Sequence, residues 1–394
     1  MTFPIENLCF FDFETKASTP DLSDGNVKTA GTARYAQNAY PIILTYAIGE
    51  GPVKCVALDG ICAQQPMVAG LFPQEIYNFG TNLDAKFVAW TAAFDRAIWN
   101  ATESFQPYDL LPAHTLDAMV QAVASNLPAG LGAAGRALGL GGKQADGSKL
   151  ISMFCAHDGW TATSHPAEWE LFKSYAVRDT ALLRDIWKAT RPLPLVEWQD
   201  YWVNERINDR GMEIDLHFAA RAAAVAEADT VRSNAIIADL TGEDITKITQ
   251  AQALAQWIYD RLDDAKARDM LVKEYDDEAP EDEELKPARL SVARDRIEKV
   301  LTYLDSVDAD VGLSDMEWLI YQLLELRQFG GSSSPQKFSK MLRQHVNGRL
   351  MNQYVLNGAA QTGRYSSRGV QVHNLFRKSL GAGEVDAMEM INQL

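Results

Sequence analysis

The sequence predicts an α/β domain at the N-terminus, followed by a mainly helical region. Three observations support this fold class. Residues 8–15 form an apolar, aromatic-rich run typical of a buried strand, and two more such runs follow at residues 42–48 and 53–58. A further strand pattern at residues 86–90 is followed at once by a helical pattern. Beyond Pro194 the apolar positions recur at helical spacing.

The first strand ends in two acidic residues, Asp12 and Glu14. Side chains two apart in a strand leave the same face of a sheet, so both carboxylates are expected to point the same way. Carboxylates held side by side repel each other unless a cation lies between them, and a hard divalent ion suits oxygen ligands. Taken alone, the pair fits a solvated surface equally well. The metal-binding interpretation therefore needs further carboxylates.

The segment after the first strand is rich in small and polar residues, so residues 16–40 are expected to form a loop. Residues 49–52 form a hairpin-like turn between the next two strands, which predicts an antiparallel pair. Asp95 follows the strand at residues 86–90, in a helix that begins near Ala92. Sites in layered α/β proteins form at such junctions, although an Asp near a helix start is also a common cap.

Residues 130–135 match the pattern G-x-G-x-x-G. A dinucleotide-binding loop with this pattern must follow a strand. Here Ser125 or Asn126 as a cap, with Pro128 in the first turn, indicates the start of a helix instead. We therefore expect a helix of small residues that packs closely on its neighbours. A nicotinamide-binding enzyme is the alternative that this run would support.

A long helix is predicted at residues 165–187, where Tyr175 and Asp179 share one face about one turn apart. This is the third acidic position, and an exposed Tyr–Asp pair is its alternative interpretation. Pro192-Leu193-Pro194 is expected to end the first domain. The helical patterns beyond it cover residues 195–208, 217–240, 249–275, 289–308 and 314–328, with an acidic, proline-containing loop at residues 276–287.

Charge is distributed unevenly along the chain. The net charge of −16 disfavours nucleic acid as a partner, because phosphate binding depends on Lys and Arg. Residues 326–383, called the basic segment below, nevertheless contain no Asp or Glu and carry +9, which leaves −25 for the rest. This asymmetry indicates a polyanion-binding segment, and a basic face paired with acidic helices of the same chain is the alternative. Its cations are Arg327, Lys337, Lys340, Arg343, Arg349, Arg364, Arg368, Arg377 and Lys378.

Composition narrows the remaining classes. The four cysteines lack the spacing of a zinc site or of a disulfide framework, so reduced thiols are expected. No apolar run is long enough to span a membrane, and the first residues lack the basic start of a signal peptide. We therefore expect a cytoplasmic protein with no membrane partner.

The acidic positions form an ordered set: Asp12-x-Glu14, Asp95 after a strand, and Tyr175-x-x-x-Asp179 on a late helix. In this order and these settings the set resembles the DEDD superfamily of 3′-5′ exonucleases, in the branch with Tyr in the third motif. The resemblance implies a ribonuclease H-like exonuclease domain. It also implies two divalent ions, Mg²⁺ or alternatively Mn²⁺, in the hydrolysis of the 3′-terminal phosphodiester of DNA.

The same resemblance implies a role for each residue of the set. Asp12 would contact both ions, Glu14 and Asp179 would hold the ion that activates water, and Asp95 would hold the other through water. Tyr175 would orient the attacking water. The implied contacts to the terminal nucleotide are Thr15 and Phe94.

The resemblance extends beyond residue 191, where the implied exonuclease domain 1–191 ends. Residues 207–215 look like the segment that joins exonuclease and polymerase in bacteriophage family A DNA polymerases, and residues 326–337 resemble the thumb of those enzymes. Thr362-Gly363-Arg364-Tyr365-Ser366-Ser367 and the later Gln371-x-x-Asn374-Leu375 are similar to the T-G-R-x-S-S and Q-x-x-N-L elements at the start of the palm.

This part of the resemblance implies a mainly α-helical linker and thumb over residues 195–345 and the start of a polymerase palm over residues 346–394. Contacts to the minor groove near the primer end would be nearly independent of sequence, as a polymerase requires. The implied DNA-binding residues are Lys337, Lys340, Arg364, Ser366, Ser367, Gln371 and Asn374.

Two departures from the family pattern affect the prediction. Trp90-Thr91 stand where related phage enzymes commonly have His-Asn, and the chain ends at Leu394, before the palm's metal-binding Asp motifs and the Lys-bearing fingers helix. We therefore expect the proofreading part of a split or truncated DNA polymerase, which cannot copy DNA alone and is completed by a second polypeptide with the remaining palm and fingers. The alternative is a non-catalytic DNA-binding or assembly subunit whose nuclease site has decayed.

Overall fold

The structure is a computed structural model, and it describes residues 3–21, 24–58, 72–102, 108–142, 147–273, 289–330, 335–359 and 362–375. The chain divides into two compact units. The first comprises Met1–Leu216 together with Lys340–Leu375, and the second is His217–Ser339. The division therefore falls at Leu216 and Lys340, whereas the sequence predicted boundaries near residues 191 and 345.

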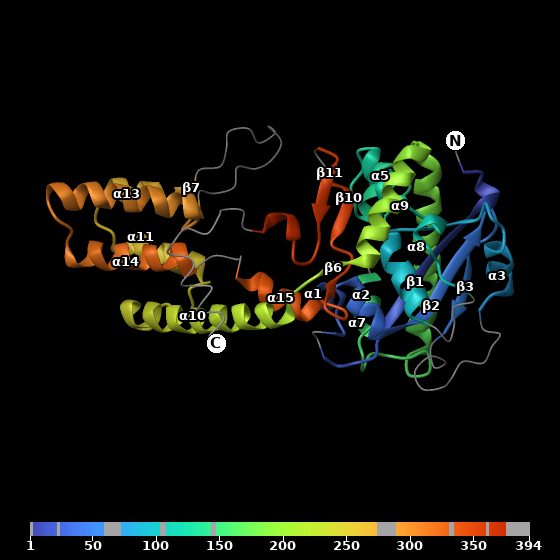
Figure 1. Cartoon of the computed structure of the whole chain (residues 1–394), viewed down its shortest axis with the longest axis horizontal. Helices are drawn as coiled ribbons and strands as arrows, with labels where there is room; N and C mark the ends of the chain where they lie inside the picture. The colour runs from blue at the N-terminus through green and yellow to red at the C-terminus, as the bar shows by residue number, and fades with distance from the viewer. Residues whose placement is uncertain are drawn as a thin grey trace. The chain divides into compact units, whose positions relative to one another are not determined.

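The first unit is built on a five-stranded sheet with the order β3-β2-β1-β4-β5 (Figure 1). The strands are β1 (Leu8–Ala17), β2 (Ala39–Ile48), β3 (Lys54–Ala57), β4 (Lys86–Ala89) and β5 (Thr115–Asp117). The pairs β1–β2 and β2–β3 are antiparallel, while β1–β4 and β4–β5 are parallel. The predicted antiparallel start of the sheet is thus confirmed, and the fold class of this unit is α/β.

Helices cover both faces of the sheet. The even-numbered residues of β1 pack toward α8 (Pro166–Ala189), as in the edge-to-face contact of Phe10 with Trp187 at 6.4 Å. The odd-numbered residues pack toward α4 (Ala92–Ala101), as in the contact of Phe11 with Trp99 at 5.9 Å. This alternation follows from the two-residue period of a strand, and it places Asp12 and Glu14 on the α8 face.

The predicted loop at residues 16–40 is wrong in part. Strand β1 continues to Ala17, and two short helices follow, α1 (Val27–Ala30) and α2 (Thr32–Gln37). Long-range hydrogen bonds fix these helices: Gln344 Nε2 donates to the Thr29 carbonyl at 3.0 Å and Arg34 Nη1 to the Leu342 carbonyl at 3.3 Å. Helices this short are unstable alone, so their stability comes from tertiary contact that the local sequence does not reveal.

The glycine-rich run forms the helix α6 (Leu131–Ala137), as predicted. It follows the helix α5 (Ala118–Ala124) rather than a strand. The predicted helix start is wrong, because Gly130 is the N-cap and Ser125 ends α5 instead. A side chain at Gly135 would lie 2.9 Å from Cδ1 of Leu182 on α8, so the glycine allows the close packing that the sequence predicted.

The remaining elements of the first unit lie around this core. They are the helices α3 (Gln74–Gly80), α7 (Gly147–Phe154) and α9 (Leu195–Arg210), the 3-10 turns Ile5–Asn7, Pro112–His114 and Val372–Asn374, and two small antiparallel pairs. One pair joins β6 (Met212–Glu213) to β9 (Arg349–Leu350), and the other joins β10 (Tyr354–Ala359) to β11 (Arg364–Ser367). The helix α15 (Gln336–Gln344) enters this unit at Lys340.

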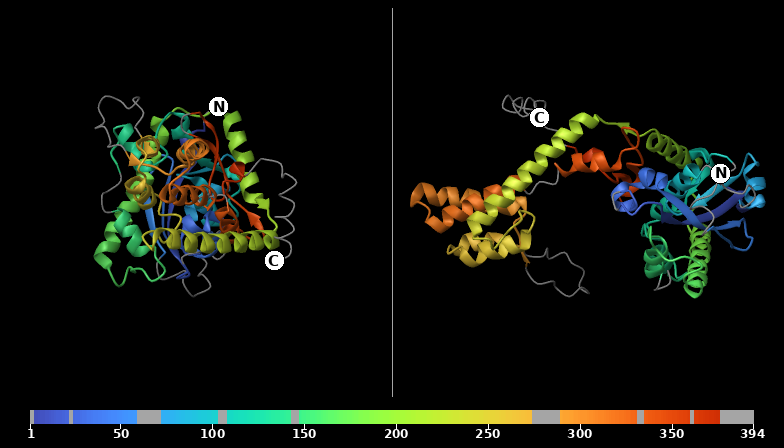
Figure 2. Two further views of the ribbon diagram at one scale, coloured as in Figure 1. Left: turned by 90° about the vertical axis from the view of Figure 1, so that its left-hand side faces the viewer. Right: turned by 90° about the horizontal axis from the view of Figure 1, so that it is seen from below.

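The second unit is helical. It contains α10 (Leu216–Thr241), α11 (Ala251–Arg261), α12 (Ala265–Leu271), α13 (Arg294–Asp310) and α14 (Asp315–Gly330), with a short pair of β7 (Val272–Lys273) and β8 (Arg289–Leu290). Helices α13 and α14 lie side by side (Figure 1), and α10 is seen along its length in Figure 2. The single helix predicted at residues 249–275 is two helices and a short strand over its described part. The predicted acidic loop at residues 276–287 lies outside the described residues. Over the residues that the structure describes, no helix has the length and apolar character needed to cross a membrane.

Candidate active site

The two acids of β1 lie on the face of the sheet that α8 covers. Asp12 is the one partly exposed residue in a strand that is otherwise buried, so solvent reaches the sheet at this position. Glu14 is 8% exposed, and a β-bulge follows it between Glu14 and Thr15. Bulges bend a strand and redirect its side chains, which places an irregularity of the sheet directly beside the acid pair.

Asp179 lies on α8, the helix that covers this face. Asp12 stands directly opposite Thr45 in the β1–β2 register, and residues opposite each other share a face. The hydroxyl oxygens of Thr45 and Thr180 lie 2.7 Å apart in a hydrogen bond, and Thr180 follows Asp179 on α8. Asp179 is itself buried, at 4% exposure, so the predicted exposed Tyr–Asp pair is excluded.

Asp95 reaches the acid pair from α4. The parallel pairing of β1 with β4 ends at Phe10, so the next amides on that edge of β1 have no strand partner in β4. Oδ1 of Asp95 accepts a hydrogen bond from the Phe13 N–H at 3.0 Å, between Asp12 and Glu14 in the chain. Burial raises the pKa of Asp95 well above its usual range and the charge of Asp12 raises it further, whereas the Phe13 N–H lowers it.

Tyr175 is buried on α8, one turn before Asp179, and its ring stacks on Phe172 at 6.2 Å. The ring packs against Gly147 at the start of α7, where any side chain would overlap it. The third predicted motif is thus held by α7, because a residue larger than glycine at position 147 would displace the tyrosine.

Thr15 and Phe94 are linked through a residue that the sequence did not indicate, Tyr35 on α2. The hydroxyl oxygens of Thr15 and Tyr35 lie 2.9 Å apart, and the ring of Tyr35 stacks on Phe94 at 6.0 Å. Tyr35 also lines a cavity of about 480 Å³ with residues of the 16–40 segment and of α7. Because residues 16–40 were expected to be a loop, no signal in the sequence placed an aromatic ring there.

Asp117, at the end of β5, is a further buried acid that the sequence analysis missed. Its carboxylate accepts hydrogen bonds from the N–H groups of Thr91, Ala92 and Met119 at 3.0, 3.1 and 2.9 Å. It therefore caps α5 and also holds the turn into α4, the helix that carries Asp95. Thr91 has left-handed backbone angles, with φ at 65°. An Asp just before a helix is the usual signature of a cap, but the partner across the sheet cannot be read from the sequence.

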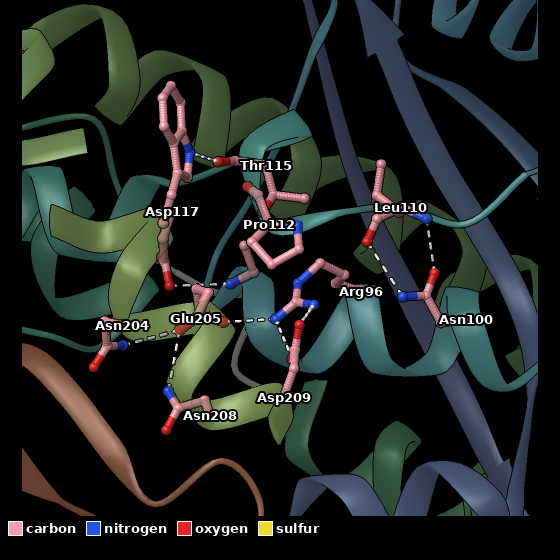
Figure 3. Close-up of polar contacts among 12 residues, drawn as sticks. Arg96, Asn100, Leu110, Pro112, Thr115, Asp117, Asn204, Glu205, Asn208 and Asp209 are labelled. Atoms are coloured by element: carbon pink, nitrogen blue, oxygen red, sulfur yellow. Dashed lines mark hydrogen bonds and ion pairs between the residues drawn. The ribbon is translucent and has the colours of Figure 1, made fainter. Parts of the chain in front are cut away.

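A buried ion pair joins α4 to α9 (Figure 3). Arg96 follows Asp95 and is 3% exposed, and its guanidinium contacts Asp209 at 2.6 and 2.8 Å and Glu205 at 2.8 Å. Burial lowers the pKa of Arg96, but the two carboxylates outweigh burial and raise it, so the guanidinium keeps its proton. Both acids lie on α9, more than a hundred residues away, and the sequence did not indicate the contact.

The donor set has the chemistry of a divalent-ion site. Asp12, Glu14, Asp95 and Asp179 offer oxygen ligands only, which suits Mg²⁺, and two of them already repel each other electrostatically. In the part of the chain that the structure describes, however, no three His, Cys, Asp or Glu side chains are grouped as metal ligands.

The predicted DNA-binding residues separate into two groups. Arg364, Gln371 and Asn374 are exposed, Ser366 and Ser367 are half-buried on β11, and Lys340 is half-buried on α15. Lys337 is half-buried in the second unit. Two other cations of the basic segment have structural partners: Arg349 binds the Arg210 and Gly211 carbonyls and Glu213, and Arg327 binds the Ile248 carbonyl. Arg377 and Lys378 lie outside the described residues.

Comparison with known proteins gives relatives among DNA polymerases. No protein-family model matches the chain. A DNA polymerase of Bacillus phage SP02 is 25% identical over 374 residues, which cover 89% of this chain and 50% of that protein. A solved structure of the POL domain of Pol1 from M. smegmatis, in complex with DNA primer-template and dNTP, gives a TM-score of 0.46 at 11% identity, over 86% of this chain and 50% of that one. A structural likeness at this level does not establish a shared fold. The chain is thus related in sequence to a phage DNA polymerase over most of its own length, and it spans about half the length of that relative.

Proposed function

We propose that this chain is a DNA polymerase-related protein whose first unit is a 3′-5′ exonuclease. It would act on the 3′-terminal phosphodiester of DNA in a proofreading role. The sequence relationship to a phage DNA polymerase supports the polymerase part of the proposal. The five-stranded sheet with helices on both faces is compatible with the ribonuclease H-like fold that the DEDD resemblance implies.

One observation carries the exonuclease proposal: the hydrogen bond from the Phe13 N–H to Asp95. It brings an acid from α4 to the backbone between Asp12 and Glu14, although 82 residues separate the two partners in sequence. Surface acids scattered by chance have no reason to meet in the middle of a buried strand. Asp179 precedes Thr180, whose hydroxyl contacts Thr45 opposite Asp12, and this supports its inclusion in the proposed set.

Asp12, Glu14, Asp95 and Asp179 would hold Mg²⁺ or Mn²⁺ in this proposal. When bound, the ions would lower the pKa of a coordinated water and neutralise charge on the phosphate. The chain's own residues supply the other requirements. Tyr175 would orient the attacking water, and its tight packing against Gly147 restricts the ring to few positions.

The terminal nucleotide would lie against Thr15 and Phe94, which Tyr35 connects. An aromatic ring stacks on any base, so such contacts accept all four nucleotides, as proofreading requires. The exposed cations and amides of β11 and the following turn would bind the duplex. In this proposal residues 1–191 are the nuclease domain, residues 195–345 are the linker and thumb, and residues 346–394 are the start of a palm.

The test is stepwise shortening of a 5′-labelled single-stranded DNA from its 3′ end in the presence of Mg²⁺. The Asp12→Ala, Glu14→Ala double variant should lose activity by at least about a thousandfold, because both carboxylates belong to the proposed ion site. Asp185→Ala, an exposed acid on α8, is the matched control and should retain full activity. Persistent digestion by the double variant would refute the assignment.

A second candidate function is a non-catalytic DNA-binding or assembly subunit. It is favoured by the absence of a grouped ligand set among the described acids. This candidate predicts DNA binding that weakens steeply with salt, with no metal-dependent cleavage by the unmodified protein.

A further inference from the structure

The helix that carries Asp95 is held by a network of hydrogen bonds that extends from α4 through α9 to β10. Its first link is Arg96, whose guanidinium binds Glu205 and Asp209 on α9 (Figure 3). The side chains of Arg96 and Glu205 are each 4% exposed, whereas that of Asp209 is 37% exposed. Glu205 is therefore the partner that water cannot replace, because a buried charge has no solvent to compensate for a lost contact.

The second link runs from Glu205 to Asn208. Oε1 of Glu205 accepts hydrogen bonds from Nδ2 of Asn204 at 3.0 Å and from Nδ2 of Asn208 at 3.2 Å. Both oxygens of the carboxylate are thus bonded, one toward α4 and one along α9. In a site from which water is excluded, such hydrogen bonds polarise one another. A change at one end of the network therefore alters the hydrogen bonds at its other end.

The third link joins Asn208 to the strand β10. Its Nδ2 donates to the Tyr354 carbonyl at 2.8 Å, its Oδ1 accepts the Tyr354 N–H at 2.9 Å, and its own carbonyl accepts the Asn352 N–H at 3.1 Å. The side-chain amide pairs with the edge of β10 much as a neighbouring strand would. Both ends of this hydrogen-bond network belong to the first unit, although residues 217–339 separate them in sequence.

We propose that a hydrogen-bond network couples the position of Asp95 to the docking of the β10–β11 hairpin. The network runs from Arg96 through Glu205 and Asn208 to Tyr354, and Arg96 and Asn208 are its positioning residues. The proposal deepens the proposed function, on which its nuclease consequence rests. The hairpin carries residues that resemble the DNA-binding start of a palm. A displacement of β10 would pull on Asn208, reorient the Glu205 carboxylate and shift Arg96, so that α4 would release Asp95 from the Phe13 N–H. Nuclease output would then depend on whether the hairpin is docked.

Alternative supports of α4 limit what the network can do alone. Asp117 holds the first turn of the helix through the Thr91 and Ala92 N–H groups. The coupling should therefore change the side-chain position of Asp95 rather than unfold α4. This distinction separates a positioning role from a structural one, and the Phe13 amide reports it directly because its hydrogen-bond acceptor is Asp95.

The experiment compares amide hydrogen exchange at Phe13 in the full chain and in Asn208→Ala. The matched control is Asn100→Ala. Asn100 lies on α4 itself and makes the same kind of paired contact, accepting the Leu110 N–H at 2.8 Å and donating to the Leu110 carbonyl at 3.2 Å. Its side chain makes no hydrogen bond to that of Arg96, whose guanidinium binds Glu205 and Asp209. Exchange at Phe13 should become about tenfold faster or more in the Asn208 variant and should stay unchanged in the Asn100 variant. The amides of the β1–β2 ladder serve as the internal reference.

A second pair of measurements addresses activity and coupling. In Asn208→Ala we expect kcat of the nuclease to fall at least about tenfold with KM unchanged, since a ligand that is displaced by about 1 Å slows the reaction more than it weakens DNA binding. Arg96→Met should give the same effect, and the double variant should be no worse than either single one. If Asn208→Ala does not fold, Asn208→Asp keeps the acceptor for Tyr354 and removes both donors.

Unchanged Phe13 exchange in a folded Asn208 variant would overturn the proposal, and so would equal acceleration in the Asn100 control. Additive effects of the Arg96 and Asn208 substitutions would also overturn it, because residues in one network should not act independently. Failure of the proposed function gives a different result from failure of the coupling. If the unmodified protein has no nuclease activity, the proposed function fails, but the exchange measurements still test the coupling. If the coupling fails, the nuclease is active and Phe13 exchange in the Asn208 variant is unchanged.

Discussion

Asp117 makes the stability of the first unit depend on pH in a direction that is unusual for an acid. Burial raises the pKa of its carboxyl from 3.8 to about 6, and the charge of Glu205 adds to this, while the Thr91 and Met119 N–H groups and the charge of Arg368 lower it. The folded state therefore binds the Asp117 proton more tightly than the unfolded chain does. The stabilisation is complete below the unfolded pKa and is lost as pH rises through the folded one.

The size of this effect follows from the shift. A rise of about two units corresponds to about 3 kcal/mol over the whole titration, of which about 1 kcal/mol falls between pH 5 and pH 8. Asp117→Asn should remove this dependence, because the amide keeps an acceptor for the α5 cap but does not titrate. The assay is urea unfolding of both proteins at several pH values, with the difference between the two free energies of unfolding plotted against pH.

The difference isolates Asp117 because all other titrating groups are common to both proteins. The unmodified protein should lose about 1 kcal/mol relative to Asp117→Asn between pH 5 and pH 8. A difference that is flat with pH, or one that grows in favour of the unmodified protein, would show that the carboxyl is already ionised in the folded state. The three N–H contacts would then outweigh burial, which would refute a raised pKa for Asp117.

Two further predictions concern residues next to the acids. Thr91→Asn should stabilise the protein by about 1 kcal/mol in urea unfolding, because Asn tolerates the left-handed conformation at φ 65° far better than a β-branched residue does. Thr102→Asn, at φ −98° on the other end of α4, is the control and should give no gain. A loss of stability in Thr91→Asn would contradict the argument that the backbone is strained at position 91. Gly147→Ala should cost about 1–3 kcal/mol and reduce nuclease activity, since the added methyl overlaps the buried ring of Tyr175; unchanged stability and activity together would show that the ring is free to move.

The sequence predicted those elements whose signals are local. The strand β1 and the β4–α4 junction appeared as apolar runs with a clear period, and α8 appeared as a long amphipathic pattern. The helices α1 and α2 did not appear, because they are too short to show a helical period and their stability depends on Gln344 and Leu342 from the far end of the chain. Propensity alone cannot report a contact made across three hundred residues.

The candidate site divides in the same way. The acids themselves could be named from their order and settings, because the resemblance supplies the order and the strand or helix supplies the setting. Their supports could not be named: Arg96 pairs with acids 109 and 113 residues away, and Asp117 reaches the turn before α4 from another strand. Buried polar partners leave no periodic trace, since each is a single residue whose role is set by the fold around it.

The position of α4 ultimately decides how the departure at Trp90-Thr91 should be judged. The carboxylate of Asp117 binds the Thr91 and Ala92 N–H groups, so the turn is fixed by backbone contacts that do not depend on the side chain at position 91. The helix then places Asp95 one turn later, where it meets the Phe13 N–H. Thr91 therefore costs stability through its left-handed backbone without moving the acid. For this reason the departure from His-Asn is weak evidence for a decayed nuclease. The Thr91 variant measures how much free energy of unfolding the left-handed turn costs, and the Asp117 variant tests how the carboxylate holds that turn.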